Sequence, residues 1–155
     1  MKRAIVLILA ATVWACGERV DELGPYVQQL KKMDGYNETL HQYGQYLKNP
    51  NLERQARDIR EGIQKYSDDM EAFGQTKDKT IKAGHNSLKR ALVRALKKLV
   101  EPDFPTFTVS AQRQVGEIEW AVNNHFSALE KAWKSAGQPE PFPLKWPEGS
   151  RKRGG

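Results

Sequence analysis

Residues 52–73 read LERQARDIREGIQKYSDDMEAF, the clearest helical pattern in the chain. Its apolar side chains recur at alternating steps of four and three residues: Leu52, Ala56, Ile59, Ile63, Tyr66, Met70 and Phe73. Such steps place side chains on one face of an α-helix, while the charged residues between them point elsewhere. The stretch therefore predicts an amphipathic helix with one packing face.

The segments on either side repeat this spacing, and nothing between residues 25 and 137 alternates with the period of a strand. Pro25 predicts the start of a first helix, because proline suits the first helical position. The apolar stripe of this helix is Val27, Leu30, Met33, Leu40, Tyr43 and Leu47. Pro50 ends it, and Asn51 is the expected N-cap of the next helix. The domain is therefore expected to be all-α.

Two later stripes complete the pattern. The first is Ile81, Leu88, Leu92, Ala95 and Leu99. The second is Ala111, Val115, Ile118, Val122, His125, Leu129 and Ala132. Pro102 and Pro105 predict a loop between them, so the last helix is expected to begin between residues 106 and 110. It is expected to close at Gly137, with Pro139 beyond.

Periodicity alone leaves open whether residues 52–100 form one helix or two. One helix of 49 residues would be about 73 Å long, against roughly 36 to 40 Å for its neighbours, so its apolar stripe would overhang into water. A break with Gly74 as C-cap and Asp78 as N-cap gives an antiparallel up-down-up-down four-helix bundle. The alternative is a long three-helix hairpin or an oligomeric coiled coil, in which a second copy covers the overhang.

Residues 138–155 contain four prolines and end in Arg151-Lys152-Arg153 before two glycines. We expect an extended, proline-rich basic tail with no core of its own, which either binds a groove on a partner or is an unstructured end. The expected organisation is a signal segment over 1–15, a linker over 16–24, the bundle over 25–137 and the tail over 138–155.

The first residues depart from the polar average of the chain, whose mean hydropathy is −0.71. Lys2 and Arg3 precede an apolar run over 4–15, and Cys16, the single cysteine, follows Ala15. The run is too short to span a bilayer, which takes about 20 apolar residues. A basic start, a short apolar run and a small residue at its end are typical of a secretory signal.

The sequence Val13-Trp14-Ala15-Cys16 resembles the lipobox of bacterial lipoproteins. The resemblance covers residues 1–16 and implies cleavage after Ala15 and acylation of Cys16. Inner-membrane lipoproteins of enterobacteria typically have Asp after the cysteine, so Gly17 implies the outer membrane. The alternative is a plain signal peptide cut near Ala15, which would leave an unpaired thiol in an oxidising compartment.

The charge of the chain is mildly basic. The full sequence has 25 basic and 19 acidic residues, a net charge of +6. Removing residues 1–15 removes two basic and no acidic residues, which leaves a net charge of +4. This excess suits an anionic neighbour such as lipid headgroups, and we expect no nucleic-acid partner.

Two residue pairs are candidate cofactor ligands. Glu38 and His41 form a Glu-x-x-His pair, as in ferritin-like di-iron bundles, and Met33 would lie near His125 if the first and last helices are antiparallel. A di-iron site needs a second such motif and further carboxylates. The alternative is a hydrogen-bonded core histidine with a core methionine, and we expect neither haem nor metal.

A cationic amphipathic stretch lies at residues 87–99. Its leucines, at 88, 92, 96 and 99, line one side. Its basic residues, which have no acidic neighbours within the stretch, are Lys89, Arg90, Arg94, Lys97 and Lys98. The leucines either enter an anionic membrane surface or face the bundle core, and in the second case the basic side can still contact phosphate or an acidic envelope polymer.

Motifs for catalysis are missing from the sequence. There is no phosphate-binding glycine loop, no Gly-x-Ser-x-Gly and no concentrated His/carboxylate cluster. The sequence therefore favours a lipid-anchored structural or accessory interaction protein of the outer membrane, with an envelope protein as partner and self-association left open. An enzyme is not expected.

Overall fold

The computed structural model describes residues 22–46, 53–73, 76–99 and 104–145. Within these ranges the regular elements are all helices: residues 22–31, α2 (Asp34–Tyr46), α3 (Glu53–Glu71), α4 (Lys79–Lys98) and α5 (Phe104–Ser135). The predicted all-α fold is confirmed.

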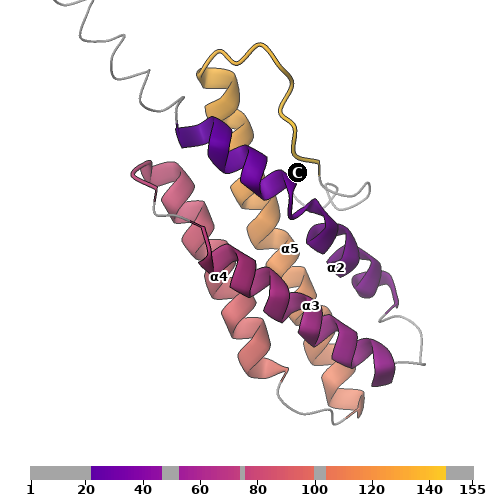
Figure 1. The fold of residues 1–155 in the computed structure, drawn as a ribbon. Coiled ribbons are helices and arrows are strands. Elements are labelled where there is room, and N and C mark those ends of the chain that lie inside the picture. Colours follow the sequence, from indigo (N-terminus) through magenta and orange to yellow (C-terminus); the bar gives the residue numbers. More distant parts are fainter. Residues whose placement is uncertain (1–21, 47–52, 74–75, 100–103, 146–155) are drawn as a thin grey trace, which may run out of the picture.

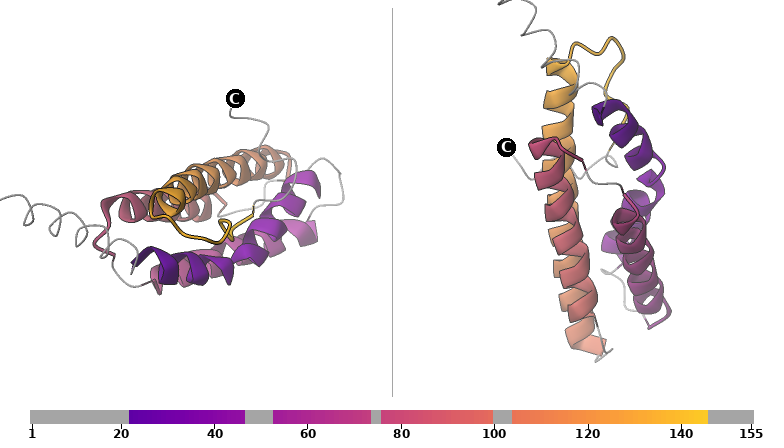
Figure 2. Two further views of the ribbon diagram at one scale, coloured as in Figure 1. Left: turned by 90° about the horizontal axis from the view of Figure 1, so that it is seen from above. Right: turned by 60° about the vertical axis from the view of Figure 1, so that its left-hand side comes forward.

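The helices form a bundle of two layers (Figures 1 and 2). Residues 22–46 and α3 make one layer, while α4 and α5 lie against each other in the second. The chain reverses its direction between residues 22–46 and α3, between α3 and α4, and between α4 and α5, so the bundle is antiparallel (Figure 1). Because each helix has one apolar face, this arrangement buries all of these faces in a common core.

The first helix differs from the prediction in two ways. It already includes residues 22–24, ahead of Pro25, and it is interrupted at Lys32 and Met33 before α2 begins at Asp34. Proline is tolerated there because the first amides of a helix have no intrahelical acceptor. The interruption carries bonds from Lys32 N to Gln29 O (3.2 Å) and from Met33 N to Leu30 O (2.8 Å). Each bond joins an amide to the carbonyl three residues earlier, as in a 3₁₀-helix. The backbone is therefore tightened just before Asp34 and Gly35, two weak helix formers.

Residues 52–100 do not form one helix, since α3 ends at Glu71 and α4 begins at Lys79. Asp78 is the N-cap, as predicted: its Oδ1 accepts from Thr80 N (2.8 Å) and Ile81 N (3.1 Å). The other expected caps of this region, Asn51 and Gly74, lie outside the described residues.

The last helix begins earlier than predicted, at Phe104 rather than between 106 and 110. Pro105 falls in its first turn, where a missing N–H costs nothing. The helix ends where expected, because Gly137 has a positive φ of 67° and accommodates the left-handed turn that closes many helices.

The predicted stripes form the core. Ile59, Ile63, Ile81, Leu88, Leu92, Ile118 and Leu129 are each at most 1% exposed. Sequence reasoning missed several core residues: Leu23, Tyr26, Ala121, Phe126, Trp133 and Leu144.

The described part of the predicted tail, residues 138–145, has no regular secondary structure but packs on the bundle. Trp133 Nε1 donates to Glu140 O at 2.9 Å, and the Phe142 ring meets the Trp133 ring edge-on at 6.2 Å. Leu144 is only 2% exposed. This part of the tail therefore packs against the core that the helices form.

The two predictions for the N-terminal segment stay untested by the structure. The predicted cleavage site at Ala15 and the predicted acylation site at Cys16 lie outside the described residues. Among the helices in the described ranges, none combines the length and the apolar character that crossing a membrane requires.

Candidate functional site

A tyrosine and two histidines from three helices meet inside the bundle. The hydroxyl of Tyr26, on the helix over 22–31, lies 2.6 Å from His125 Nε2 of α5 and 3.2 Å from His85 Nδ1 of α4. Phe73 covers the group, with ring centroids 5.3 Å from Tyr26 and 5.4 Å from His85. Tyr26 and His125 are buried and His85 is half-buried. The cluster links residues up to 99 positions apart.

The Tyr26 hydroxyl lies within hydrogen-bond distance of one ring nitrogen of each histidine, and it can donate its single proton to only one of them. The nitrogen of the other histidine must therefore donate to the Tyr26 oxygen. The remaining ring nitrogen of His125, Nδ1, is buried and has no hydrogen-bond partner.

Glycine at position 84 makes room for this arrangement. A Cβ atom there would lie 1.9 Å from His125 Nδ1 and 2.7 Å from Cε1 of the same ring. His125 Nδ1 therefore faces the Gly84 backbone of α4, a contact that only a residue without a side chain permits. Gly84 thus sets both the closeness of α4 to α5 and the position of the imidazole.

Burial keeps the cluster neutral. Desolvation lowers the pKa of His125 to about 4, and the nearby His85 contributes to the lowering. Desolvation also lowers the pKa of His85, with a further contribution from Lys89, and raises the pKa of Tyr26 above its ordinary value. The neutral form of His125 therefore stabilises the fold above the ordinary pKa of 6.5. This stabilisation is lost as the pH falls through the window from 6.5 to about 4.

A second buried polar group lies between α2 and α3. Asp34 Oδ1, both side-chain polar atoms of Asn37 and the Tyr66 hydroxyl are buried without regular hydrogen bonds. Next to them the Tyr36 and Tyr66 rings stack with centroids 5.1 Å apart, and the Tyr36 hydroxyl donates to Asp69 at 2.5 Å. Desolvation raises the pKa of Asp34 to about 6. The Asp34 carboxyl therefore favours the folded state at low pH and opposes it as the pH rises.

The structure places the predicted cofactor ligands at separate points. Glu38 is exposed and accepts from Gln42 at 3.1 Å, whereas His41 Nδ1 lies 3.5 Å from Glu119 Oε1 of α5. Met33 is buried at the interruption before α2, and His125 Nε2 is occupied by Tyr26. Within the described ranges, no three histidine, cysteine or carboxylate side chains gather as metal ligands.

The predicted cationic helix is α4, and its apolar side faces the core. Leu88, Leu92 and Leu99 are at most 2% exposed, and Leu96 packs partly buried against the same core. These leucines contact the bundle and not a membrane. The basic side is exposed, which matches the alternative in which only the cations face outward.

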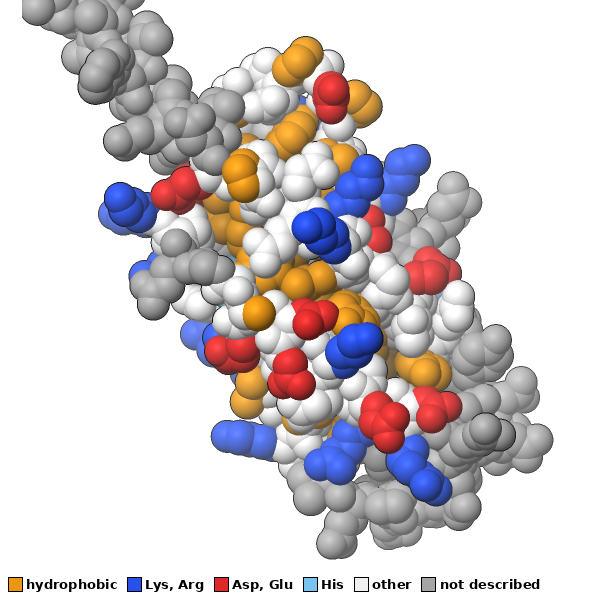
Figure 3. Space-filling view, in the orientation of Figure 1, with side chains coloured by type: hydrophobic (Ala, Val, Ile, Leu, Met, Phe, Trp, Pro, Cys, Tyr) orange, Lys and Arg blue, Asp and Glu red, His pale blue; other side chains and the backbone are white. Residues whose placement is uncertain are grey.

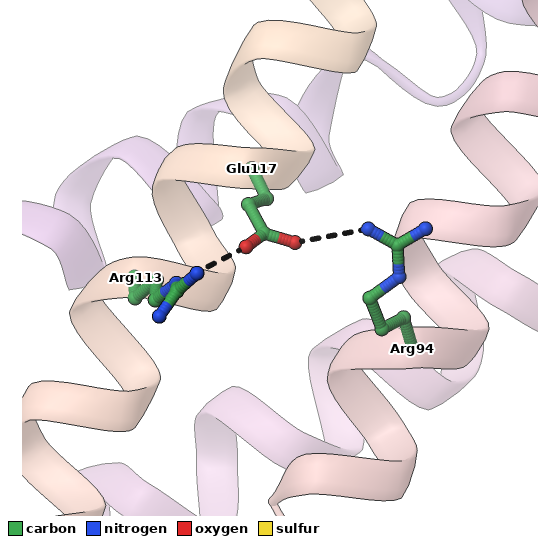
Figure 4. Close-up of polar contacts among 3 residues, drawn as sticks. All are labelled: Arg94, Arg113 and Glu117. Carbon is green, nitrogen blue, oxygen red and sulfur yellow. Dashed lines mark hydrogen bonds and ion pairs between the residues drawn. The ribbon is translucent and has the colours of Figure 1, made fainter.

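The five predicted basic residues differ in their contacts. Lys89 Nζ pairs with Glu71 of α3 at 2.6 Å. Arg94 reaches across to α5, where Glu117 accepts from Arg94 at 3.5 Å and from Arg113 at 3.3 Å (Figure 4). Arg90, Lys97 and Lys98 are exposed and form no ion pair within the described residues.

The sequence does not predict two residues of α5 that lie beside the exposed cations of α4. Arg113 and Trp120 lie on the outer side of α5, two turns apart, and Trp120 is 67% exposed. The signal that points to them is the polar spacing of α5, in which 109, 113, 116, 120 and 124 fall on the side opposite the core stripe. That they adjoin the cations of α4 depends on how the helices pack.

The chain matches no protein-family model, no curated protein and no solved structure.

Proposed function

We propose that the chain is a lipid-anchored protein of the bacterial cell envelope that serves as a structural or accessory interaction module at the outer membrane. The observation that carries this proposal is the sequence over 1–16, in which a basic start and a short apolar run end at Ala15-Cys16. Acylation at Cys16 would hold the bundle to a bilayer, because several acyl chains bind far more firmly than one.

The spacing between Cys16 and the bundle supports this proposal. Five residues lie between Cys16 and Glu22, where the described helix begins, and the six steps from one to the other can span at most about 20 Å. An anchored bundle would therefore lie next to the membrane surface, within reach of lipid headgroups and of proteins embedded beside it.

The buried groups support an interaction role more than a chemical one. Tyr26 and His125 are shielded from water, and their polar atoms are directed at each other or at backbone. The cluster joins three helices through the Tyr26 hydroxyl and is covered by the Phe73 ring, which accounts for it as a packing contact. In contrast, the exposed cations Arg90, Lys97 and Lys98 and the exposed Trp120 ring lie on the outer side of α4 and α5.

The anchor is tested by mass spectrometry of the full-length product made in a Gram-negative host. We expect an N-terminal residue 16 that carries acyl groups, and a Cys16→Ala variant that is not acylated and leaves the membrane fraction. A cleaved, exported product with an unmodified cysteine would refute the anchor. A cytosolic product that retains residues 1–15 would refute the location as well.

A further inference from the structure

The two layers of the bundle differ in charge. Helix α4 has seven basic residues and no acidic ones, and α5 has three of each. In the other layer, α3 has six acidic and four basic residues, α2 has two acidic residues and no lysine or arginine, and residues 22–33 add Glu22, Lys31 and Lys32. Acidic and basic side chains are accordingly mixed on the face that Figure 3 shows. The positive charge of the described chain is therefore concentrated on the layer of α4 and α5.

Large exposed apolar side chains follow the same division. Among the described residues they are Val93 of α4 and Val109 and Trp120 of α5, which are 38%, 68% and 67% exposed. The layer of residues 22–46 and α3 has none within the ranges described. An exposed tryptophan on a basic surface combines a ring that prefers the membrane–water interface with charges that attract anionic lipids.

The packing of α4 on α5 brings these features together. Arg94 is level with Glu117, and Gly84 is level with His125, so Arg90 lies at the height of Trp120. We define the basic face as Arg90, Arg94, Lys97 and Lys98 of α4 with Arg113 and Trp120 of α5. Glu117 is shared between two arginines, so it leaves this face strongly positive.

The first described residue, Glu22, is hydrogen-bonded to the turn that precedes α4. Glu22 Oε2 accepts from Thr76 Oγ1 at 2.7 Å, from Lys77 N at 3.0 Å and from Asp78 N at 3.1 Å. These bonds hold the beginning of the described chain against the N-terminal end of α4. Glu22, six positions after Cys16 in the sequence, thus lies at one end of the layer that carries the basic face.

We propose that the basic face rests on the anionic lipid surface of the membrane that holds the anchor, so that the bundle lies flat along α4 and α5. The inference rests on the proposed function in that the anchor at Cys16 supplies the nearby bilayer. Arg90, Arg94, Lys97, Lys98 and Arg113 pair with lipid phosphates, and the Trp120 ring enters the headgroup region. The leucines of α4 stay in the core.

A bilayer fits this face better than an extended acidic polymer. Helices α4 and α5 lie side by side and antiparallel, and α4 with its 20 residues is about 30 Å long, so the pair can lie along a plane of headgroups (Figure 2). Charges at a membrane are attracted without a fixed partner for each, so exposed lysines suffice. The Trp120 ring, which is level with Arg90 at one end of the face, gains from an interface but not from a hydrated polyanion.

The test uses the mature acylated protein in vesicles of phosphatidylcholine, with and without about 30 mol% phosphatidylglycerol. All proteins carry Trp146→Phe, so that the fluorescence comes from Trp120 and the buried Trp133. Lipids brominated near the headgroup quench a tryptophan that touches them. We expect quenching in phosphatidylglycerol vesicles that is lost in about 0.5 M salt and is absent after Trp120→Phe.

Two charge-reversal triples provide the matched comparison. Arg90→Glu/Lys97→Glu/Lys98→Glu should reduce quenching to its level in pure phosphatidylcholine. Arg57→Glu/Arg60→Glu/Lys65→Glu, which changes the same charge on the exposed side of α3, should leave it unchanged. Circular dichroism of both triples checks that the bundle is intact. Equal quenching in the two triples would overturn the proposal.

Flotation with the vesicles reports the anchor separately from the face. Protein that floats without phosphatidylglycerol-dependent quenching refutes the basic face and leaves the anchor in place. Protein that does not float refutes the anchor, and quenching by added phosphatidylglycerol vesicles then still decides the face: its presence supports the inference and its absence overturns it. A change in Trp120 fluorescence with a soluble acidic polysaccharide, and none with vesicles, assigns the face to a polymer and overturns the inference.

Discussion

The substitution Gly84→Ala tests the packing of α4 on α5 most directly. The added Cβ would lie 1.9 Å from His125 Nδ1 and 2.8 Å from Cγ of the same ring, so the imidazole must move. His125 is only 1% exposed and has no free space to enter without displacing its neighbours. The movement also breaks its 2.6 Å hydrogen bond to Tyr26.

The expected loss of stability follows from three contributions. Overpacking a buried site costs about 1–3 kcal/mol. Leaving the Tyr26 and His125 polar atoms without each other costs about 1–3 kcal/mol more. Alanine regains about 1 kcal/mol over glycine within a helix. The free energy of unfolding should therefore fall by about 3 kcal/mol, and the midpoint of thermal unfolding by about 6–12 °C.

Urea and thermal denaturation followed by circular dichroism measure this loss, and Gly116→Ala is the matched control. Gly116 lies on the exposed side of α5, and a Cβ there meets nothing within 4 Å, so alanine should raise stability by about 1 kcal/mol. In a His125→Ala background the obstructing ring is gone, and Gly84→Ala should become neutral or stabilising. A Gly84→Ala protein as stable as the wild type would refute the close approach of Gly84 and His125.

Three further predictions concern the same core and its ends. Tyr26→Phe removes the hydroxyl that both histidines contact and should cost about 1–3 kcal/mol in urea denaturation; a loss no larger than that of the less buried Tyr43→Phe would contradict the network. Because the pKa of His125 is lowered to about 4, the free energy of unfolding should fall by at most about 3 kcal/mol as the pH drops below 6.5. Asp34, whose pKa is raised to about 6, opposes this fall. In urea denaturation at several pH values, Asp34→Asn should therefore steepen the fall, and the control Asp58→Asn at an exposed position should not. Asp78→Ala removes the N-cap of α4 and should cost about 1 kcal/mol, so an unchanged unfolding midpoint would speak against the cap.

Much of the fold follows from the spacing of apolar residues. The alternation over 52–73 and the stripes around Ile81 and Ile118 predict the helices and most of the core, because each helix must bury one face. The interruption at Met33 was not predicted, since the apolar spacing continues across it while only the backbone bonds change. Leu23 was missed because it precedes Pro25, the predicted helix start, although it lies seven residues before Leu30. Tyr26 lies inside the predicted helix, four residues before Leu30, and was missed as a core residue.

The candidate sites depended more on tertiary packing. The sequence indicates that His125 lies on an apolar stripe, but not that Tyr26, 99 residues earlier, supplies its hydrogen bond or that Gly84 makes room for its ring. Likewise, the cations of α4 are evident from the sequence. Their neighbours Arg113 and Trp120 belong to another helix, and only the packed bundle brings them alongside.

The three bonds that Glu22 accepts also have a mechanical consequence. A force that pulls on the chain ahead of residue 22 acts first on one carboxylate, which is bonded to Thr76, Lys77 and Asp78. The load passes from there into the turn before α4 and is spread over the rigid pair of long helices, so residues 22–31 need not peel away from the core. A tethered bundle built in this way can resist tension at its attached end without unravelling from it.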